Sequence, residues 1–373
     1  MKKHISILLP NLRCGGAERV TVNLANGFIK RGYAVDMILL SAKGEFLVDL
    51  LPEIRVIDLK VNRMRGLFFP LIRYILTQRP TALLACMWPL SMIAILACKL
   101  SCVDVRLMVV EHTTWSRDFI CNSRFKRWQV ATSMHYIFPF ARDIVTVSQG
   151  AADDLTRFAN LCRDDVKVIY NPVVGESKPD NTSLLPPQDW WVGPHHKVLA
   201  VGTLTAIKDY FTLLKAFAQL RQKVDARLLI LGEGDCRTSL ETHIKQLGLE
   251  GSVFLPGFIK DPSPYYKQAD LHVLSSIGEG LPTVIIEALA AGTPVVSTDC
   301  LSGPREILCD GRFGDLVPVG DSAALAIAMA DSLNTRHDSA TLKLRAQDFS
   351  IDNAVTLYLA MLFPEVFEKK VDP

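Results

Sequence analysis

Short apolar runs alternate with helix-like segments along almost the whole sequence, and this rhythm constrains the fold more than any other feature. "HISILLP" precedes the helix-like "AERVTVNLANGFIKRG", and further apolar runs follow: "AVDMILLS", "ALLACMW", "VRLMVVEH", "DIVTVSQ" and "VKVIYNP". Continuous apolar strands that alternate with helices are typical of parallel sheets with helices on both faces. The first half of the chain is therefore predicted to be an α/β domain.

The rhythm is interrupted once, after Pro172. "VVGESKPDNTSLLPPQDWWVGPHH" is rich in proline, glycine and polar residues, which is typical of a linker. Alternation then resumes with "KVLAVGTL", "ARLLILGEG", "SVFLPGF", "LHVLSS" and "TPVVSTD". A chain of 373 residues is also too long to fold around a single hydrophobic core of ordinary size. We therefore predict two Rossmann-like parallel-sheet domains facing a cleft, over 1–175 and 196–349, joined by a linker over 176–195.

Two apolar stretches could be mistaken for targeting or membrane segments. The N-terminal "MKKHISILLPNLR" has too short an apolar core for a signal peptide, and we interpret it as a buried strand. The uncharged stretch from Thr81 to Cys98 is long enough to span a membrane. Pro89 and Ser91 divide it, however, into a short strand, "ALLACMW", and a helix that begins with proline, "PLSMIAILACKLS".

The nine cysteines are scattered, without a C-x-x-C pair. Such cysteines are expected to be free thiols in a reducing compartment, not a disulfide framework or a zinc site. Charge is unevenly distributed: residues 1–180 carry 24 Lys+Arg against 16 Asp+Glu, and the remainder carries 17 against 23. One basic and one acidic half indicate two domains that meet different partners.

The basic excess is concentrated in residues 60–142, which hold 12 Lys+Arg and 3 Asp+Glu. Basic residues mixed with Phe, Trp and Tyr favour an anionic membrane surface, and we expect apolar insertion by Leu67, Phe68, Phe69 and Trp128. Nucleic acid is the competing partner for any basic face, but the sequence has no nucleic-acid-binding motif.

In open α/β sheets ligands bind beyond the carboxyl ends of the strands, so functional residues are expected directly after strands. Gly15 and Gly16 follow the first predicted strand and open a helix whose N–H groups could meet an anion, although a tight turn explains them equally well. His112 lies just past "VRLMVVE", where a structural hydrogen-bonding role is the commoner alternative.

Two glycine-containing loops of the second half offer further candidates. In "VGTLTAIKDY", Lys208 could act as a point charge for phosphate, or it could be a solvated surface lysine. "LGEGDC" supplies Gly232 and Gly234, which make only half of a dinucleotide-binding fingerprint.

The stretch "EGLPTVIIE" carries two glutamates eight residues apart. Pro282 is expected to be the first helical residue, so that "TVIIEALAAG" forms a helix closed by Gly292. Glu279 then lies in the preceding loop and Glu287 on a mostly apolar helix, where a carboxylate is costly unless it is paired or bound. A ribose diol would satisfy Glu287, and the loop N–H groups would meet a pyrophosphate. Pairing of Glu287 with a neighbouring basic side chain is the alternative.

These motifs, in this order, resemble the retaining glycosyltransferases of family 4, which have the GT-B fold. The order of the segments is far more specific than any one of them. The resemblance extends over nearly the whole chain through "GGAERV", "VSQG" with "VIYNPV", "VGTLTAIKDYFTLLKAFA", "LLILGEGDCRTSLE", "VFLPGF", "SSIGEGLPTVIIEALAAGTPVVSTDCLSGPREIL" and "FSIDNAVTLYLAML". The last segment resembles the family's C-terminal helix, so residues 350–373 are expected to return to the N-terminal domain.

The resemblance implies roles for individual residues. Glu279 would face the donor sugar, Glu287 would hold the ribose, and Lys208 would neutralise the diphosphate. His112 would lie in the cleft near the donor sugar. The other donor-binding residues that the resemblance implies are Gly15, Gly16, Thr203, Gly280, Leu281, Pro282 and Thr283.

The sequence departs from the family's pattern at one position of this site. Many members have arginine five residues before the lysine, where this chain has Thr203. Diphosphate stabilisation is then left to Lys208, to helix N–H groups and to Arg305 as a further candidate. No D-x-D motif occurs in the sequence, which agrees with transfer that needs neither a metal nor a cofactor.

The resemblance implies transfer of a sugar, with retention, from a nucleotide diphosphate sugar, for which UDP is the expected carrier. The expected acceptor is a glycan or a lipid-linked saccharide, because "DCLSGPREIL" is similar to members that build bacterial surface glycans. The enzyme would then work in the cytoplasm, peripherally bound to the inner face of the cell membrane. The alternatives are another GT-B enzyme such as a nucleotide-sugar epimerase, an NAD-binding oxidoreductase, and a non-catalytic carbohydrate-binding protein.

Overall fold

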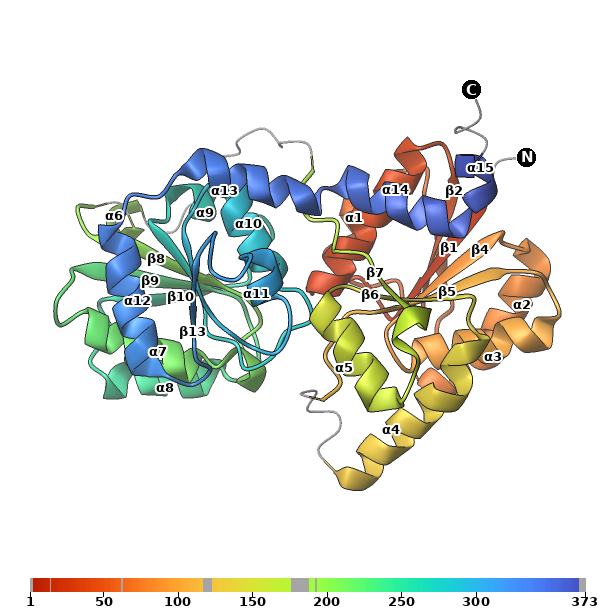
Figure 1. Cartoon of the computed structure of the whole chain (residues 1–373), viewed down its shortest axis with the longest axis horizontal. Helices are drawn as coiled ribbons and strands as arrows, with labels where there is room; N and C mark the ends of the chain where they lie inside the picture. Colours follow the sequence, from red (N-terminus) through yellow and green to blue (C-terminus); the bar gives the residue numbers. More distant parts are fainter. Residues whose placement is uncertain are drawn as a thin grey trace. The chain divides into compact units, whose positions relative to one another are not determined.

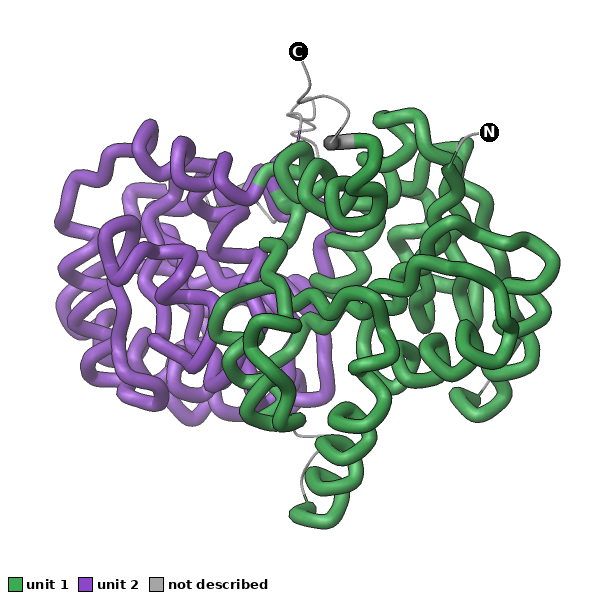
Figure 2. The backbone as a smooth tube through the Cα atoms, turned by 45° about the vertical axis from the view of Figure 1, so that its right-hand side comes forward, with its two compact units in different colours: residues 1–173, 350–373 green, residues 174–349 purple. Residues whose placement is uncertain are grey.

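The computed structural model describes residues 3–13, 15–61, 63–116, 123–175, 188–191 and 193–368. They form two compact units, each built on its own parallel sheet (Figure 1). Unit 1 comprises the described residues of 1–173 and 350–373, and unit 2 those of 174–349, as coloured in Figure 2. The predicted α/β fold with two parallel-sheet domains is confirmed.

Unit 1 contains a seven-stranded sheet in the order β3-β2-β1-β4-β5-β6-β7, and all neighbouring strands are parallel. The strands are β1 His4–Leu9, β2 Ala34–Leu39, β3 Arg55–Asp58, β4 Ala82–Cys86, β5 Arg106–Glu111, β6 Asp143–Thr146 and β7 Val166–Val168. The helices are α1 Gly16–Lys30, α2 Phe68–Gln78, α3 Leu90–Ser101, α4 Arg124–Ile137, α5 Gln149–Ala159, α14 Ile351–Leu362 and α15 Pro364–Glu368.

Helices cover both faces of this sheet because its central strands are apolar on both sides. In β1, Ile7 packs with residues of α1 and α14, whereas its neighbour Leu8 packs with residues of α2 to α5. Successive side chains of a strand point to opposite faces, so a continuous apolar run is what a doubly covered strand requires. The stretch 81–98 forms β4 and α3, as predicted, and no helix among the described residues is both long and apolar enough to cross a membrane.

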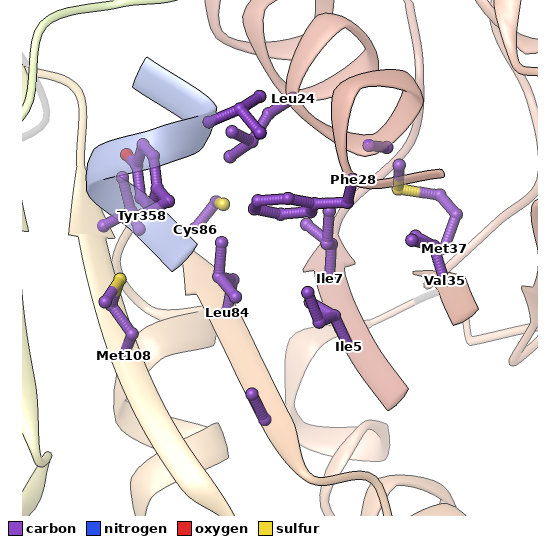
Figure 3. Close-up of a cluster of buried hydrophobic side chains, with 14 of the residues drawn as sticks. Ile5, Ile7, Leu24, Phe28, Val35, Met37, Leu84, Cys86, Met108 and Tyr358 are labelled. Carbon is purple, nitrogen blue, oxygen red and sulfur yellow. The ribbon is translucent and has the colours of Figure 1, made fainter. Parts of the chain in front are cut away.

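The C-terminal helix α14 is part of the core of unit 1. Val355 and Tyr358 are buried together with Phe28 of α1, and Gly27 leaves room for Val355, because a Cβ at Gly27 would lie 2.4 Å from its Cγ2 atom. Figure 3 shows Tyr358 beside Cys86 at the end of β4. Helix α14 therefore covers part of the same face of the sheet as α1.

Unit 2 contains a six-stranded parallel sheet in the order β10-β9-β8-β11-β12-β13. The strands are β8 His196–Val201, β9 Ala226–Leu231, β10 Val253–Gly257, β11 Leu271–Leu274, β12 Val295–Thr298 and β13 Asp315–Val317. The helices are α6 Gln188–Trp191, α7 Tyr210–Leu220, α8 Arg237–Gln246, α9 Ser263–Gln268, α10 Thr283–Ala291, α11 Pro304–Ile307, α12 Ser322–Asn334 and α13 Ser339–Ala346.

The short helix α6 falls within the predicted linker but belongs to unit 2. Trp191 is fully buried, and the Trp190 indole donates to the carbonyl of Gly251 at 3.2 Å. Residues 176–187 of the predicted linker lie outside the described residues. The abundance of proline and glycine in this segment therefore did not predict that the two tryptophans belong to unit 2.

Two predictions about proline and one about exposure were wrong. Pro89 and Pro282 were expected to be the first residues of their helices, but each precedes a helix that begins one residue later. The ψ of 100° at Pro282 keeps its backbone extended and outside α10. Leu67 was expected to insert into a membrane, but it is completely buried in the core that α2 covers, whereas Phe69 is 78% exposed.

Candidate active site

The predicted site residues lie at the loop edges of the two sheets, close to where the strand order reverses. In unit 1 the order reverses between β1 and β4, and in unit 2 between β8 and β11. Loops that leave neighbouring strands in opposite directions at such a point create the usual ligand site of an open α/β sheet. Gly15 and His112 follow β1 and β5, and Lys208 and Glu279 follow β8 and β11.

In unit 2 the structure brings Lys208 and Glu279 into direct contact. The Lys208 ammonium lies 2.5 Å from Oε1 of Glu279, and both side chains are largely buried. The two residues are 71 positions apart in the sequence. Separating such a pair is costly, because each charge would be left uncompensated in a largely buried position. The two side chains therefore hold each other in place.

Two serines at the end of β11 fix both partners of this ion pair. The Ser276 hydroxyl donates to Oε1 of Glu279 at 2.6 Å, and the Ser275 hydroxyl donates to the carbonyl of Lys208 at 2.8 Å. The backbone N–H of Ile277 also donates to the carbonyl of Ile207 at 2.8 Å. Both side-chain bonds to Glu279 reach Oε1, so Oε2 has no hydrogen-bond donor among the described residues.

The negative charge of Glu279 affects two neighbouring acidic groups. Burial, and after it the Glu279 charge, raises the pKa of Tyr210 well above its ordinary value. Burial and the same charge raise the pKa of the Cys300 thiol to about 12. Both groups are therefore neutral at physiological pH, and Lys208 is the cation in contact with Glu279.

The glycines of "LGEGDC" serve packing between loops. A Cβ at Gly232 would lie 1.9 Å from the carbonyl oxygen of Gly202, and a Cβ at Gly234 would lie 2.5 Å from that of Leu204. The backbone N–H of Leu204 donates to the carbonyl of Glu233 at 2.9 Å. The loop after β9 therefore supports the loop that carries Thr203 and Lys208.

The segment after β12 packs against the loop that precedes α10. The Ser302 hydroxyl donates to the carbonyl of Gly280 at 2.8 Å, and a Cβ at Gly303 would lie 2.3 Å from the ring of Pro282. Leu281 and Pro282 are buried, and Thr283 begins α10. This packing fixes where the helix N–H groups point. Glu287 is half-buried in the second turn of the same helix.

Arg305, the further candidate for diphosphate binding, is already engaged by carboxylates. Its guanidinium forms ion pairs with Asp299 and, at 3.1 Å, with Asp310. Thr203, at the position where many family members have arginine, is exposed in the loop after β8. Lys208 and Arg305 are thus both paired with carboxylates, but the Lys208 side chain is largely buried whereas the Arg305 side chain is 56% exposed.

In unit 1, His112 is half-buried, and both of its ring nitrogens are buried. Neither ring nitrogen has a partner among the described residues, and burial lowers the pKa of His112 to about 4. The imidazole is therefore neutral at physiological pH. Both ring nitrogens of His272 in β11 also lack a partner among the described residues, so the distinguishing feature of His112 is its position directly after β5 at the loop end of the sheet.

Three neighbours of His112 in the fold were not found by sequence reasoning. Glu111, at the end of β5, is buried and accepts from the Ser91 hydroxyl at 3.0 Å and from the Trp88 backbone N–H at 3.3 Å. The Trp88 and Trp115 rings pack edge to face at 6.0 Å, and neither indole N–H has a partner among the described residues. Trp88 in "CMWP" ends one predicted strand and Trp115 in "HTTW" follows another, and this position could have marked them as candidate site residues.

Gly15 and Gly16 lie at the start of α1, as predicted, but a carboxylate is already present there. Gly15 is the N-cap and has an extended backbone. A Cβ at Gly15 would lie 2.0 Å from Oε2 of Glu18, so Glu18 folds back against the glycine. Burial raises the pKa of Glu18. An anion approaching this helix would thus meet an acidic side chain beside the glycines.

Comparison with known proteins identifies the chain. The family model described as "Glycosyltransferase Family 4" matches residues 14–175, and the model described as "Glycosyl transferases group 1" matches residues 191–349. The two matches include the site residues of both units. The chain is a family 4 glycosyltransferase.

Two relatives of this glycosyltransferase come from Campylobacter jejuni. One is an N-acetylgalactosamine-N,N'-diacetylbacillosaminyl-diphospho-undecaprenol 4-alpha-N-acetylgalactosaminyltransferase, 27% identical over 86% of this chain and 87% of its own. The other, an alpha-1,4-N-acetyl-D-galactosaminyltransferase that acts on GalNAc-alpha-(1->4)-GalNAc-alpha-(1->3)-diNAcBac-PP-undecaprenol, is 28% identical over 96% of this chain and 98% of its own.

The solved structures confirm the fold of the glycosyltransferase. Anabaena HepE, crystallised with UDP-glucose, superposes with a TM-score of 0.76 at 22% identity over 96% of this chain and 99% of that protein. A glycosyltransferase from Rickettsia africae superposes with a TM-score of 0.78 at 18% identity over 98% of this chain and 99% of that protein.

Proposed function

We propose that this glycosyltransferase moves a sugar from a nucleotide diphosphate sugar, with UDP as the carrier, to a glycan or lipid-linked saccharide, with retention at the anomeric carbon. One observation carries the proposal: Lys208 and Glu279, far apart in sequence, meet beside the start of α10, which bears Glu287. A cation, a helix start and two carboxylates could supply contacts for the diphosphate, the ribose and the transferred sugar.

The cation and the helix start suit the diphosphate. The leaving group develops negative charge as the glycosidic bond breaks, and preorganised donors stabilise that charge best. Lys208 is held in place by its ion pair and by Ser275, so it needs little reorganisation before the reaction. The N–H groups at the start of α10 add the positive end of a helix dipole.

The carboxylates suit the two sugars of the donor. Glu287 would accept hydrogen bonds from both ribose hydroxyls, and Oε2 of Glu279 would accept from a hydroxyl of the sugar to be transferred. The neutral His112 would exchange hydrogen bonds with an uncharged hydroxyl, because its lowered pKa removes the competing cationic form. We assign no carboxylate as a nucleophile. For retention, the acceptor hydroxyl would then attack the anomeric carbon on the face from which the nucleoside diphosphate departs, while the sugar cation and the diphosphate form an ion pair.

The acceptor is proposed from the relatives and from the basic segment of unit 1. Both Campylobacter jejuni relatives carry undecaprenol-linked substrates in their names. Residues 60–142 of this chain hold 12 Lys+Arg against 3 Asp+Glu. An anionic membrane surface that presents a lipid-linked saccharide fits both observations, and the enzyme would bind it peripherally.

Binding of UDP to Glu287 variants tests the proposal. Losing hydrogen bonds to a charged group costs roughly 1.5–3 kcal/mol each, so Glu287→Ala should weaken UDP binding by a factor of at least ten in isothermal titration. Glu287→Gln, which retains one acceptor oxygen, should lose less. Glu250→Ala removes an exposed glutamate elsewhere in unit 2 and should bind normally. Unchanged affinity in Glu287→Ala would refute the nucleotide site.

The chemical step is tested separately by nucleotide release from a panel of nucleotide sugars. An enzyme should release nucleoside diphosphate in the presence of acceptor, whereas a carbohydrate-binding protein would bind without turnover. Release of a free epimerised sugar would favour the epimerase alternative.

A further inference from the structure

The first two turns of α4 project from unit 1 into solvent. Figures 1 and 2 both show α4 extending beyond the rest of the unit. Residues 123–129 are all exposed, and Val130 is the first buried residue of the helix. The Ser123 hydroxyl caps the helix by accepting from the backbone N–H of Lys126 at 3.1 Å. We call residues 123–129 the α4 tip.

The solvent face of α4 carries a stripe of aromatic side chains. Residues advance by about 100° each around a helix, so Phe125, Trp128 and Tyr136 fall within an arc of about 80°. Val130 and Met134, which are buried, lie on the opposite side. Phe125, Trp128 and Tyr136 are 65%, 61% and 68% exposed. A helix that only covers a sheet would carry polar residues on this face.

Phe125 and Trp128 also pack against each other. Their rings are stacked, with centroids 6.1 Å apart and an angle of 27° between their planes. The pair forms one exposed apolar surface at the α4 tip. Large exposed aromatic surfaces of this kind mark interaction sites on proteins.

Cations flank this stripe, and no acidic residue is near it in the sequence. Arg124 and Lys126 lie on either side of Phe125, and residues 123–142 contain no Asp or Glu. Arg127 faces the protein, where it lies over the Phe158 ring at 5.4 Å. Basic residues in the first turn oppose the helix dipole, so Arg124 and Lys126 do not serve helix stability.

We propose that the α4 tip docks on an anionic lipid bilayer, with Phe125 and Trp128 inserted into the interface and Arg124 and Lys126 at the headgroups. Aromatic rings favour the boundary between headgroups and acyl chains, and basic side chains are attracted by anionic lipid. The docking surface is narrower than the whole segment 60–142, and it would bring unit 1 to the membrane that holds the acceptor proposed above.

Co-sedimentation of the full-length protein with vesicles tests the docking surface. We expect binding to vesicles of phosphatidylglycerol and phosphatidylcholine at low salt, and little binding to phosphatidylcholine alone. Arg124→Glu/Lys126→Glu should weaken binding at least 25-fold, since each cation contributes about five-fold. Phe125→Ser/Trp128→Ser should remove the part of the binding that survives high salt.

Matched variants separate the α4 tip from other surfaces. Lys215→Glu/Lys223→Glu makes the same change of charge on unit 2, and Phe69→Ser removes an exposed aromatic ring from α2. Both should bind vesicles within two-fold of the unchanged protein. Equal losses in these controls and in the α4 variants would overturn the assignment to the α4 tip.

Tryptophan fluorescence reports insertion directly. Brominated lipid should quench the protein, and Trp128→Phe should remove most of that quenching while keeping vesicle binding. Absence of binding to anionic vesicles at low salt would overturn the proposal, as would tighter binding to a single-stranded RNA than to vesicles. UDP binding of each variant serves as the folding control and is measured without lipid, so failure of the docking surface is distinguishable from failure of the nucleotide site.

Discussion

The loop edges of the two sheets have the same place in the fold but opposite chemistry. In unit 2, Lys208 and Glu279 are charged, paired and fixed by serine hydroxyls. In unit 1, His112 is neutral, and its ring nitrogens, like the indole N–H groups of Trp88 and Trp115, are buried without partners among the described residues. In unit 2 the two charges are already paired with each other, whereas in unit 1 the buried ring nitrogens and indole N–H groups have no partner among the described residues.

This difference suits the two edges to different chemical groups. A diphosphate needs charge that is in place in advance, because reorganising charged groups during the reaction is costly. Neutral donors and acceptors suit hydroxyl groups, whose hydrogen bonds repay the cost of burying those nitrogens. The proposed function accordingly assigns the charged part of the donor to the edge of unit 2, and an uncharged hydroxyl group to His112 of unit 1.

Removing the cation from the edge of unit 2 should have the largest effect. Lys208→Ala is expected to lower kcat by a factor of at least one hundred, while KM for the donor changes much less, because the charge is needed most as the leaving group departs. Lys215→Ala, an exposed lysine of α7, is the control. Near-normal turnover in Lys208→Ala would show that another group stabilises the leaving group.

Changing the neutral edge of unit 1 should affect pH dependence as well as turnover. Burial holds the pKa of His112 near 4, below its ordinary 6.5, so its contribution to stability is complete above pH 6.5 and is lost as the pH falls toward 4. Between pH 7 and pH 5 this loss is about 2 kcal/mol. His112→Gln should reduce the loss, measured by urea unfolding, and should lower kcat about ten-fold.

His272 provides the matched control for this prediction. It is buried in β11 of unit 2, and burial lowers its pKa to about 3. His272→Gln should therefore change the pH dependence of stability while leaving kcat within two-fold. If both variants lost turnover equally, His112 would have only a structural role.

A smaller effect is expected from the hydroxyl that orients Glu279. Ser276→Ala removes one buried hydrogen bond to a carboxylate and should lower kcat by a factor of about ten, with UDP affinity unchanged. Thr293→Val removes another buried hydroxyl bond of unit 2, at 2.6 Å to the carbonyl of Tyr266, and should leave kcat unchanged. A loss of UDP affinity in Ser276→Ala would place Glu279 at the nucleotide instead of the transferred sugar.

The smallest effect is expected from a chelator. If Lys208 and helix N–H groups neutralise the diphosphate, EDTA should change turnover by less than two-fold. Strong inhibition that added magnesium reverses would show that a metal ion shares the role assigned here to unit 2.

The sequence by itself determined the fold class and where the two proposed site glutamates lie relative to a helix. Alternating apolar runs predict strands covered on both faces, and this local pattern does not depend on distant partners. The E-x7-E spacing likewise places Glu279 in a loop and Glu287 on the following helix, as the structure shows. The helix start was misplaced by one residue because the prediction took Pro282 as helical.

Only the tertiary structure decided which groups meet. Lys208 and Glu279 contact each other across 71 residues of sequence, and the positions of Ser276 and of the carboxylates that engage Arg305 depend on how loops from different strands pack. The sequence also did not determine which residues are buried: Leu67, just before α2, is in the core, whereas Phe69, two residues later in the first turn of α2, is exposed. Composition gives the residues that can take part, but side-chain direction and packing decide which of them face a ligand.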